Sequence, residues 1–282
     1  MNMRKILLSR KMLGGGNSGG DGGNSGGGEE WIGDGNTHIW ISLQEGRTSP
    51  MLGVCPKGTV TVDWGDGSEP DTLTGTSTST VQWTPTHEYG KAGDYVITLN
   101  VDGEVGFNGA GNTNLYANVL RYSSAADGRN KVYQSSVKRV ELGYNVTRMS
   151  DFSFGYCYAL ESIIISNSLT NIGDSAFLSC TNLASVTIPN GVITIGKNAF
   201  NSCSRITSID IPGSVTKLDT AAFNACYGMR YYDFTKHTSV PTLTSATILI
   251  PSDVEFRVPA ALADEWKAAT NWSTFADYIV GV

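Results

Sequence analysis

Cysteine and phenylalanine recur with a period of 23 residues in the second half of this sequence. Each cysteine of the series follows a phenylalanine by three residues, in the pairs Phe154 and Cys157, Phe177 and Cys180, Phe200 and Cys203, and Phe223 and Cys226. A unit this short cannot bury its own apolar face, whereas stacked units share one continuous core. The period therefore predicts a solenoid with structural ladders of Phe and Cys inside it.

Each unit has the pattern of two short extended pieces. Residues 185–188 alternate like a strand, a Pro-Asn-Gly turn follows, residues 192–195 are extended again, and residues 199–203 are expected to form a brief helical turn. An earlier unit without its cysteine begins at Val137. We therefore expect about four full coils and a degenerate fifth, within a solenoid that spans residues 137–258.

The repeat resembles the BspA-type leucine-rich repeat. The signature of that family is written here between Ile195 and Pro212 as I-G-x-x-A-F-x-x-C-x-x-I-x-x-I-x-I-P, and the resemblance extends from Val137 to Phe234. After the repeats, Pro259 stands at the favoured first position of a helix expected over 260–269. Residues 259–282 resemble the C-terminal cap seen with such repeats in gut bacteria and their prophages. Leu262, Trp266 and Tyr278 are expected to close the end of the stack there.

The cysteines could indicate zinc binding or catalysis, but their spacing favours a structural role. Zinc sites in proteins use cysteine pairs two to four residues apart, and this sequence has none. A cysteine at the same inward position of every coil is a small apolar core residue. The chain has five cysteines, including Cys55, so disulfides between cysteines of neighbouring repeats would leave at least one thiol unpaired within the chain. We favour free, buried thiols.

The segment 31–107 has a different pattern of short β-branched and aromatic runs between Gly, Asp and Pro, which predicts a small antiparallel β-sandwich. Three of its motifs resemble a PKD-type immunoglobulin-like domain over residues 37–105: V-D-W-G-D-G-S from Val62, H-E-Y from His87 and G-D-Y-V-I-T-L from Gly93. The fold class that we expect for the whole chain is therefore mainly β. It combines a small PKD/Ig-like β-sandwich with a BspA-type leucine-rich-repeat solenoid and a short C-terminal capping helix.

Within this first domain we expect Gly65 and Gly67 to allow a tight turn, and Trp64 and Tyr95 to face each other in the core. Its carboxylates could be calcium ligands, because hard cations take several carboxylate oxygens. Their spacing matches no defined calcium loop, so turn formation is the favoured interpretation; the residues are Asp63, Asp66, Asp71 and Asp94. His87 has no Cys, Ser or second His near it in sequence and is expected to be a structural residue bonded to a turn.

The N-terminal residues indicate a short peptide followed by a tether. An apolar run of three residues at 6–8 ends at Ser9, Arg10 and Lys11, which is too short for the core of a secretion signal. We interpret residues 1–13 as a docking peptide, with a frayed terminus as the alternative. Residues 14–30 form a Gly-rich flexible linker, and residues 108–136 connect the sandwich to the repeats.

The composition argues against nucleic acid and membrane partners. The formal net charge is −6, and no basic stripe is present that could bind phosphates. No apolar run approaches the roughly 18 residues of a membrane span. We find no nucleophile with a base, no phosphate loop, no metal cluster and no carboxylate pair in a cleft, so we expect no enzyme activity and no cofactor.

We therefore expect a non-catalytic binding or adhesion protein, displayed on the cell surface or outside the cell, that recognises a protein or glycan on a cell surface. The alternative is a phage virion accessory protein, such as a tail or head fibre, that docks to virion proteins through residues 1–13. A purely structural spacer is the third class.

The expected binding surface is the outward face of the repeat strands. Side chains alternate across a strand, so the residues between two buried positions point outward and stack in columns. One column is Glu141, Ile164, Thr187, Asp210 and Asp233, and the second is Arg139, Ser162, Ser185, Ser208 and Tyr231. The candidate ligand-binding residues are Glu141, Thr187, Asp210, Arg230, Tyr231 and Asp233. The alternative is a solvated polar face without a partner.

Overall fold

The computed structural model describes residues 33–78, 85–107, 119–122, 135–246 and 249–282. The regular secondary structure of these residues is mainly β-strand, as expected, and Gly33–Val282 forms one compact unit. The expected docking peptide 1–13, the linker 14–30 and most of the connecting segment 108–136 lie outside the described residues.

The first part of the described chain contains six strands. They are β1 (Thr37–Leu43), β2 (Pro50–Leu52), β3 (Val54–Asp63), β4 (Asp71–Thr76), β5 (Gly93–Phe107) and β6 (Leu120–Tyr122). Strands β1, β5, β3 and β4 lie side by side in an antiparallel sheet, because their alternating apolar residues share one buried face. The second sheet of the expected sandwich consists, among the described residues, of β2 and β6 alone.

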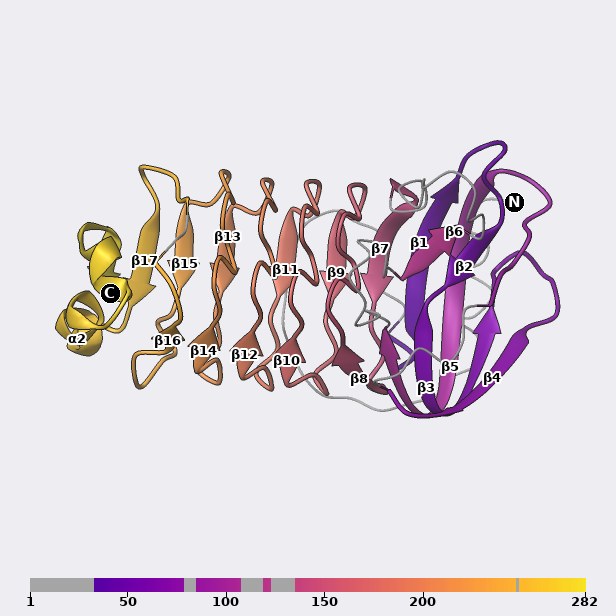
Figure 1. The fold of residues 1–282 in the computed structure, drawn as a ribbon, viewed down its shortest axis with the longest axis horizontal. Helices are drawn as coiled ribbons and strands as arrows, with labels where there is room; N and C mark the ends of the chain where they lie inside the picture. Colours follow the sequence, from indigo (N-terminus) through magenta and orange to yellow (C-terminus); the bar gives the residue numbers. More distant parts are fainter. Residues whose placement is uncertain (1–32, 79–84, 108–118, 123–134, 247–248) are drawn as a thin grey trace. The chain divides into compact units, whose positions relative to one another are not determined.

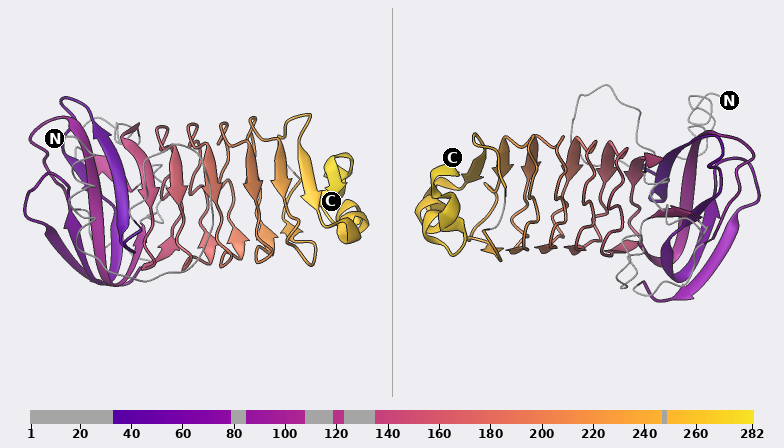
Figure 2. Two further views of the ribbon diagram at one scale, coloured as in Figure 1. Left: turned by 180° about the vertical axis from the view of Figure 1, so that it is seen from behind. Right: turned by 45° about the horizontal axis from the view of Figure 1, so that its top comes forward.

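The repeats form two rows of short parallel strands (Figure 1). The odd-numbered row consists of β7 (Val137–Glu141), β9 (Ser162–Ile164), β11 (Ser185–Thr187), β13 (Ser208–Asp210), β15 (Tyr231–Asp233) and β17 (Glu255–Val258). The even-numbered row consists of β8 (Val146–Met149), β10 (Asn171–Ile172), β12 (Thr194–Ile195), β14 (Lys217–Leu218) and β16 (Thr242–Leu243). Two further views show the same rungs from behind and from above (Figure 2).

Consecutive repeats pair in parallel at the 23-residue period. Ile163 pairs with Val186 in the odd-numbered row, and Ile172 pairs with Ile195 in the even-numbered row. The period lengthens at the end of the odd-numbered row, where Tyr232 pairs with Phe256. The described part of this row has six strands, so the expectation of four full coils and a degenerate fifth was too low.

The apolar ladders fill the space between the two rows. The Phe rings at the four repeat positions stack nearly parallel, with centroids 5.7 Å, 5.1 Å and 5.2 Å apart from one rung to the next. The Cys side chains of the same repeats are buried as well. Burial at this density is the main stabilising contribution to such a stack, at about 1.5–3 kcal/mol for each large apolar side chain.

The prediction of a helical turn at 199–203 is wrong, because these residues form a non-helical turn. In the equivalent turn of the preceding repeat, the N–H groups of Ser175, Phe177 and Ser179 donate to carbonyl oxygens of the next repeat at 2.7–2.8 Å. The N–H groups of the residues between them, Ala176 and Leu178, donate to carbonyl oxygens within the turn. Because every second N–H group bonds to the next repeat, the consecutive hydrogen bonds of a helix cannot form. Ser175 and Ser179 adopt positive φ values of 56° and 58° to reach the next repeat. The bonds between repeats offset this backbone strain.

The first part and the repeats share one sheet. Strand β1 pairs with β7, and β5 pairs in parallel with β8, so each row of repeat strands continues into the antiparallel sheet. The segment 108–136 was expected to separate two domains. The structure instead places strands from both sides of it within one compact unit.

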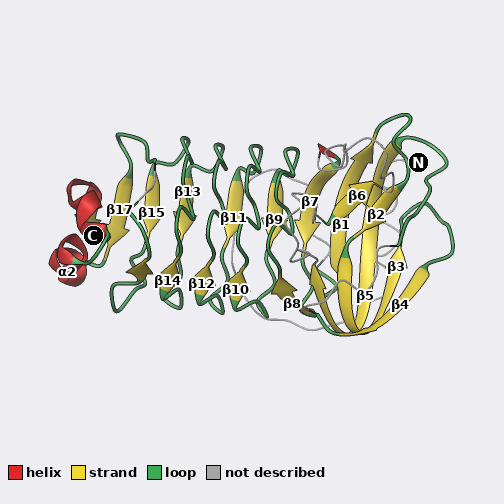
Figure 3. Cartoon of the chain, viewed as in Figure 1, coloured by secondary structure: helices red, strands yellow, loops and turns green. Residues whose placement is uncertain are grey.

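The C-terminal residues close the open end of the stack (Figure 3). Instead of one helix over 260–269, the chain forms η2 (Ala260–Leu262), α2 (Ala263–Ala268), η3 (Trp272–Tyr278) and β18 (Ile279–Gly281), which pairs with β17. Trp266 is fully buried, and Leu262 and Tyr278 pack at the margin of the core, as expected. Trp272 and Phe275 are buried with them and were not foreseen.

Candidate functional site

The outward face of the odd-numbered row carries most of the predicted site residues. Ile164, Thr187 and Asp210 are exposed, while Tyr231 and Asp233 are half-buried. Asp210 pairs in register with Asp233, which pairs with Arg257. The column therefore extends one strand beyond the predicted one. Arg257 was missed because the last interval is 24 residues instead of 23.

Glu141 does not belong to this exposed face. Its side chain is 8% exposed, and its Oε1 accepts a hydrogen bond from the N–H of Gly33 at 2.8 Å. The chain that enters β1 crosses this end of β7, where Thr37 Oγ1 also accepts from the N–H of Gly143 at 2.9 Å. The prediction that Glu141 binds a ligand was therefore wrong, because the sequence pattern could not show what covers it.

The hydrogen-bonded ladder of the odd-numbered row has a gap between β11 and β13, although the two strands remain neighbours (Figure 1). The strands β7, β9 and β11 belong to the large sheet, whereas β13, β15, β17 and β18 form a separate four-stranded sheet. No ladder joins Thr187 on β11 to Asp210 on β13 among the described residues. The remaining candidate residues are thus on or beside the four-stranded sheet of β13, β15, β17 and β18, and Thr187 lies outside this sheet.

Tyr231 has its ring face covered by a cation. The guanidinium carbon of Arg257 lies 3.9 Å from the ring centroid, and Arg257 Nε donates to Oε2 of Glu255 at 2.8 Å. A guanidinium over an aromatic ring is attracted by the ring quadrupole and is held in place by it. Tyr231 is half-buried, and an oriented guanidinium lies over one face of its ring.

The two aspartates differ in their surroundings. Asp210 is 68% exposed and faces Lys236 at 3.9 Å, a surface pair that adds little stability. Asp233 Oδ1 accepts from the N–H of Thr235 at 2.9 Å and from its hydroxyl at 2.6 Å. With exposed Arg230, this sheet offers donors, acceptors and an aromatic edge side by side.

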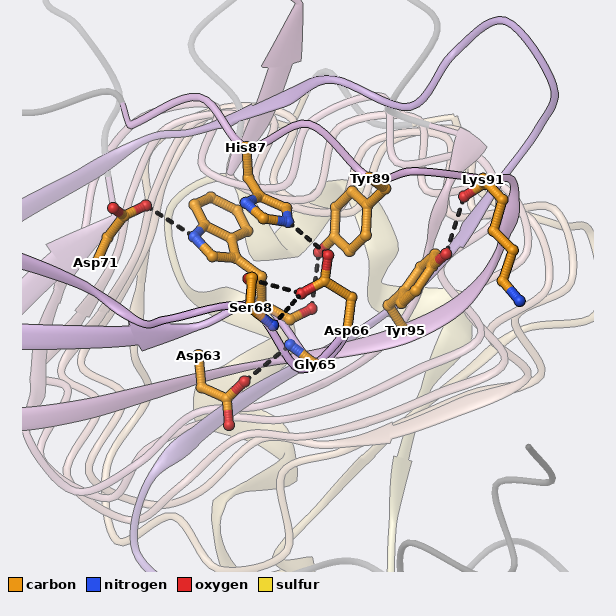
Figure 4. A network of polar contacts seen from close by, with 10 residues as sticks. Asp63, Gly65, Asp66, Ser68, Asp71, His87, Tyr89, Lys91 and Tyr95 are labelled. Carbon is orange, nitrogen blue, oxygen red and sulfur yellow. Dashed lines mark hydrogen bonds and ion pairs between the residues drawn. The ribbon is translucent and has the colours of Figure 1, made fainter.

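A second polar network holds the first part of the chain together (Figure 4). Asp66 accepts from the N–H and hydroxyl of Ser68 at 3.1 Å and 2.7 Å, and His87 Nε2 lies 2.8 Å from its other oxygen. Burial raises the pKa of Asp66, but the hydrogen bonds from Ser68 and His87 outweigh it and leave the pKa below its ordinary value. The expectation that His87 is bonded to a turn is confirmed.

The aromatic packing beside this network differs from the prediction. Trp64 does not face Tyr95; it stacks on His87 with centroids 4.8 Å apart, and Tyr89 lies between Trp64 and Tyr95. Gly65 and Gly67 have positive φ, as the tight turn requires.

Of the carboxylates in this region, Asp63 and Asp66 bond within turns, whereas Asp71 holds the indole of Trp64. Asp63 accepts from the N–H of Gly65 at 2.9 Å, and Asp71 accepts from the indole N–H of Trp64 at 2.8 Å. Within the described ranges, no group of three or more His, Cys, Asp or Glu side chains could hold a metal ion. No helix of the described chain is long and apolar enough to span a bilayer.

The cysteines are free and buried, as predicted. The Sγ of Cys180, Cys203 and Cys226 each donates to the carbonyl oxygen of the Phe in the preceding repeat at 3.1 Å. Burial raises the pKa of Cys157 and of Cys226 to about 12. A thiol in this state is a poor nucleophile, because the thiolate is the reactive form.

Three comparisons with known proteins show what this chain is similar to. A family model described as the BspA type leucine rich repeat region matches residues 128–242 in six copies. No curated protein matches the chain. Among solved structures, the leucine-rich repeat protein TpLRR of T. pallidum is similar, with 22% identity and a TM-score of 0.34 over 49% of this chain and 68% of that chain. Residues 128–242 of this protein are therefore similar in sequence to the BspA-type leucine-rich repeat region.

Proposed function

We propose that this protein is a non-catalytic binding protein whose ligand surface is the outward face of β13, β15 and β17. The observation that carries the proposal is the gathering of Asp210, Tyr231, Asp233 and Arg257 on neighbouring strands of one sheet, with exposed Arg230 directly before β15. Aromatic and Arg side chains next to carboxylates are the residue types that supply most of the energy at recognition surfaces. The ligand that we propose is a protein or glycan on a cell surface.

The first part of the chain is proposed to be a PKD-like domain that displays the repeats outside the cell. The packing of Trp64 against His87 and Tyr89, on the turn that Asp66 organises, supports this assignment. The alternative of a phage virion accessory protein depends on residues 1–13, which lie outside the described residues. Fractionation would separate the two, because the protein would be found with the cell envelope in one case and with purified particles in the other.

The binding surface is tested by replacing Asp210, Tyr231 and Asp233 together with Ala and measuring binding to arrays of immobilised glycans and proteins. We expect the triple variant to lose the binding of the unmodified protein while its melting temperature changes little, since none of the three side chains is buried in the core. A matched variant with Lys197→Ala and Thr216→Ala, at exposed positions outside the odd-numbered row, should bind normally. Unchanged binding by the triple variant would assign the site to the loops of the first part.

A further inference from the structure

An open groove of about 530 Å³ lies on the other side of the molecule, where the even-numbered row meets the first sheet. Strand β8 lies between β5 and β10 at this place (Figure 1). The lining comes from these three strands and the turns beside them, and the described lining residues are Thr78, Glu104, Thr147, Arg148, Met149, Ser150, Asp151, Thr170, Asn171 and Gly173. The outward face of the odd-numbered row contributes nothing to it.

A β-bulge and a glycine shape the groove. Val105 pairs with Val146 and Gly106 pairs with Arg148, so Thr147 is an extra residue on β8. Such a bulge changes the direction in which the neighbouring side chains point. A Cβ atom on Gly106 would lie 3.3 Å from the Cβ of Arg148 and would overlap the carbonyl oxygen of Thr78. Glycine at this position therefore allows the two walls to approach each other.

The two carboxylates in the groove are already bonded to other groups. Glu104 accepts from Lys57 Nζ at 2.9 Å and from the hydroxyl of Thr147 at 3.1 Å, and the bond from Lys57 lowers the pKa of Glu104. Asp151 Oδ1 accepts from the backbone N–H of Asp174 at 3.0 Å. The negative charge of the groove is thus partly compensated within the chain.

Arg148 is the cation of this groove. Its side chain is exposed, and its Nε donates to Ser150 Oγ at 3.2 Å, which orients the guanidinium plane. No ion pair to Arg148 is present among the described residues. The two terminal nitrogens therefore remain as a planar fork, and this geometry matches a carboxylate.

The walls of the groove are polar. Thr78, Thr147, Thr170 and Asn171 line the groove together with Arg148, and the one large apolar residue of the described lining, Met149, is only 3% exposed. The described lining has no apolar recess of the kind that anchors the aromatic or aliphatic side chains of a peptide. A ligand covered with hydroxyl groups suits such walls better.

We propose that this groove binds an acidic saccharide, with the carboxylate of a uronic or sialic acid residue on the guanidinium of Arg148 and sugar hydroxyls on the Thr and Asn side chains. The even-numbered row offers a continuation for a longer chain. Asn171 pairs with Thr194, which pairs with Lys217, at the spacing of about 4.8 Å between parallel strands. This site does not depend on the function proposed for the odd-numbered row.

The test is calorimetric titration of the full chain with trigalacturonate and with sialyllactose, which separate the two sources of acidic sugar, and with neutral maltotriose. We expect at least one acidic probe to bind ten times more tightly than maltotriose, and its affinity to fall as salt is added. Arg148→Ala should weaken that binding by about ten- to a hundredfold, and Arg148→Lys, which keeps the charge and loses the fork, by a smaller factor. Arg205→Ala, which removes an exposed arginine outside the lining of the groove and outside the odd-numbered row, should leave it unchanged.

Several results would overturn the proposal. They are no binding of either acidic probe at millimolar concentration, equal binding of maltotriose, and an Arg148→Ala variant that binds as well as the unmodified protein. Triglutamate that binds as tightly as the acidic sugars would assign the groove to acidic peptides instead. If Arg148→Ala fails to fold, the affinity of Arg148→Lys for the acidic probe tests the proposal, because lysine keeps an aliphatic side chain at this position. Unchanged affinity of Arg148→Lys would then overturn it.

Discussion

Three of the repeat cysteines, Cys180, Cys203 and Cys226, have a specific bonding role. Each thiol donates to the carbonyl oxygen of the Phe one repeat earlier, and that carbonyl stands in a turn whose N–H groups bond forward to the next repeat. A small side chain with a weak donor satisfies this buried acceptor without the desolvation cost of a strongly polar group. Conversion to a disulfide would remove the donors.

Replacing Cys203 tests this role. We expect Cys203→Ala to lower the free energy of unfolding by about 1–3 kcal/mol, because it leaves a cavity and removes the donor to Phe177. Cys203→Ser keeps a hydrogen-bond donor to the carbonyl oxygen of Phe177 and should lower the free energy of unfolding by less. Urea denaturation of both variants measures the difference. Ligand binding should be unaffected, and a stable variant that no longer binds would show that the thiol itself takes part in function.

At the scale of an element, Asp219 joins two neighbouring repeats. Its Oδ1 accepts from the N–H of Thr220 at 2.7 Å and from the hydroxyl of Thr244 at 2.8 Å, and its Oδ2 lies 2.9 Å from Lys217 Nζ. The hydrogen bond from Lys217, with those from Thr220 and Thr244, outweighs burial and lowers the pKa of Asp219 to about 2. The preceding repeats have Gly173 and Gly196 at this position and lack the connection.

The lowered pKa predicts how stability depends on pH. A carboxyl whose pKa is lower in the folded state stabilises the fold above its ordinary pKa of 3.8, and this contribution is lost as the pH falls towards 2. Asp219→Asn should therefore be less stable by about 1–2 kcal/mol at pH 7 and equal to the unmodified protein near pH 2. Urea denaturation between pH 2 and pH 7 measures this difference. Asp253→Asn, at an exposed position, is the control, and a constant difference across the range would contradict the prediction.

At the scale of the whole molecule, the first sheet takes the place of an N-terminal cap. Strand β1 covers the edge of β7, and β5 covers the edge of β8, so the first repeat exposes neither row to solvent. A stack of repeats needs such a cover, because an open edge leaves unpaired backbone groups and apolar surface exposed. The aromatic cluster of Trp266, Trp272 and Phe275 closes the other end.

This arrangement predicts the behaviour of fragments. The sheet that the two parts share leads us to expect that the repeats do not fold without the first part. Residues 106–282 expressed alone should fail to give a cooperative thermal transition, because the edges of β7 and β8 lose their partners. Residues 33–282 should melt cooperatively by circular dichroism. A cooperative transition in the shorter fragment would show that the repeats do not need this cover.

The sequence by itself determined which residues of the repeats are buried. The positions of Phe200, Cys203 and Ile209 carry an apolar residue in each neighbouring repeat, 23 residues apart. An apolar residue at the same position of every repeat has to face the same side of the stack. The parallel register follows from the same argument. The tight turn at Gly65 was equally readable, because only glycine adopts a positive φ there without strain.

The tertiary structure alone decided what covers each end and which surface is continuous. Glu141 occupies an outward position of the repeat and is buried because a segment more than one hundred residues earlier in the chain crosses it. The turn at 199–203 has helical propensity, yet hydrogen bonds to the next repeat override it. Arg148 lies in a groove because β5 joins β8 with a bulge. These features depend on contacts between residues far apart in the chain, and a local pattern of side chains does not encode such contacts.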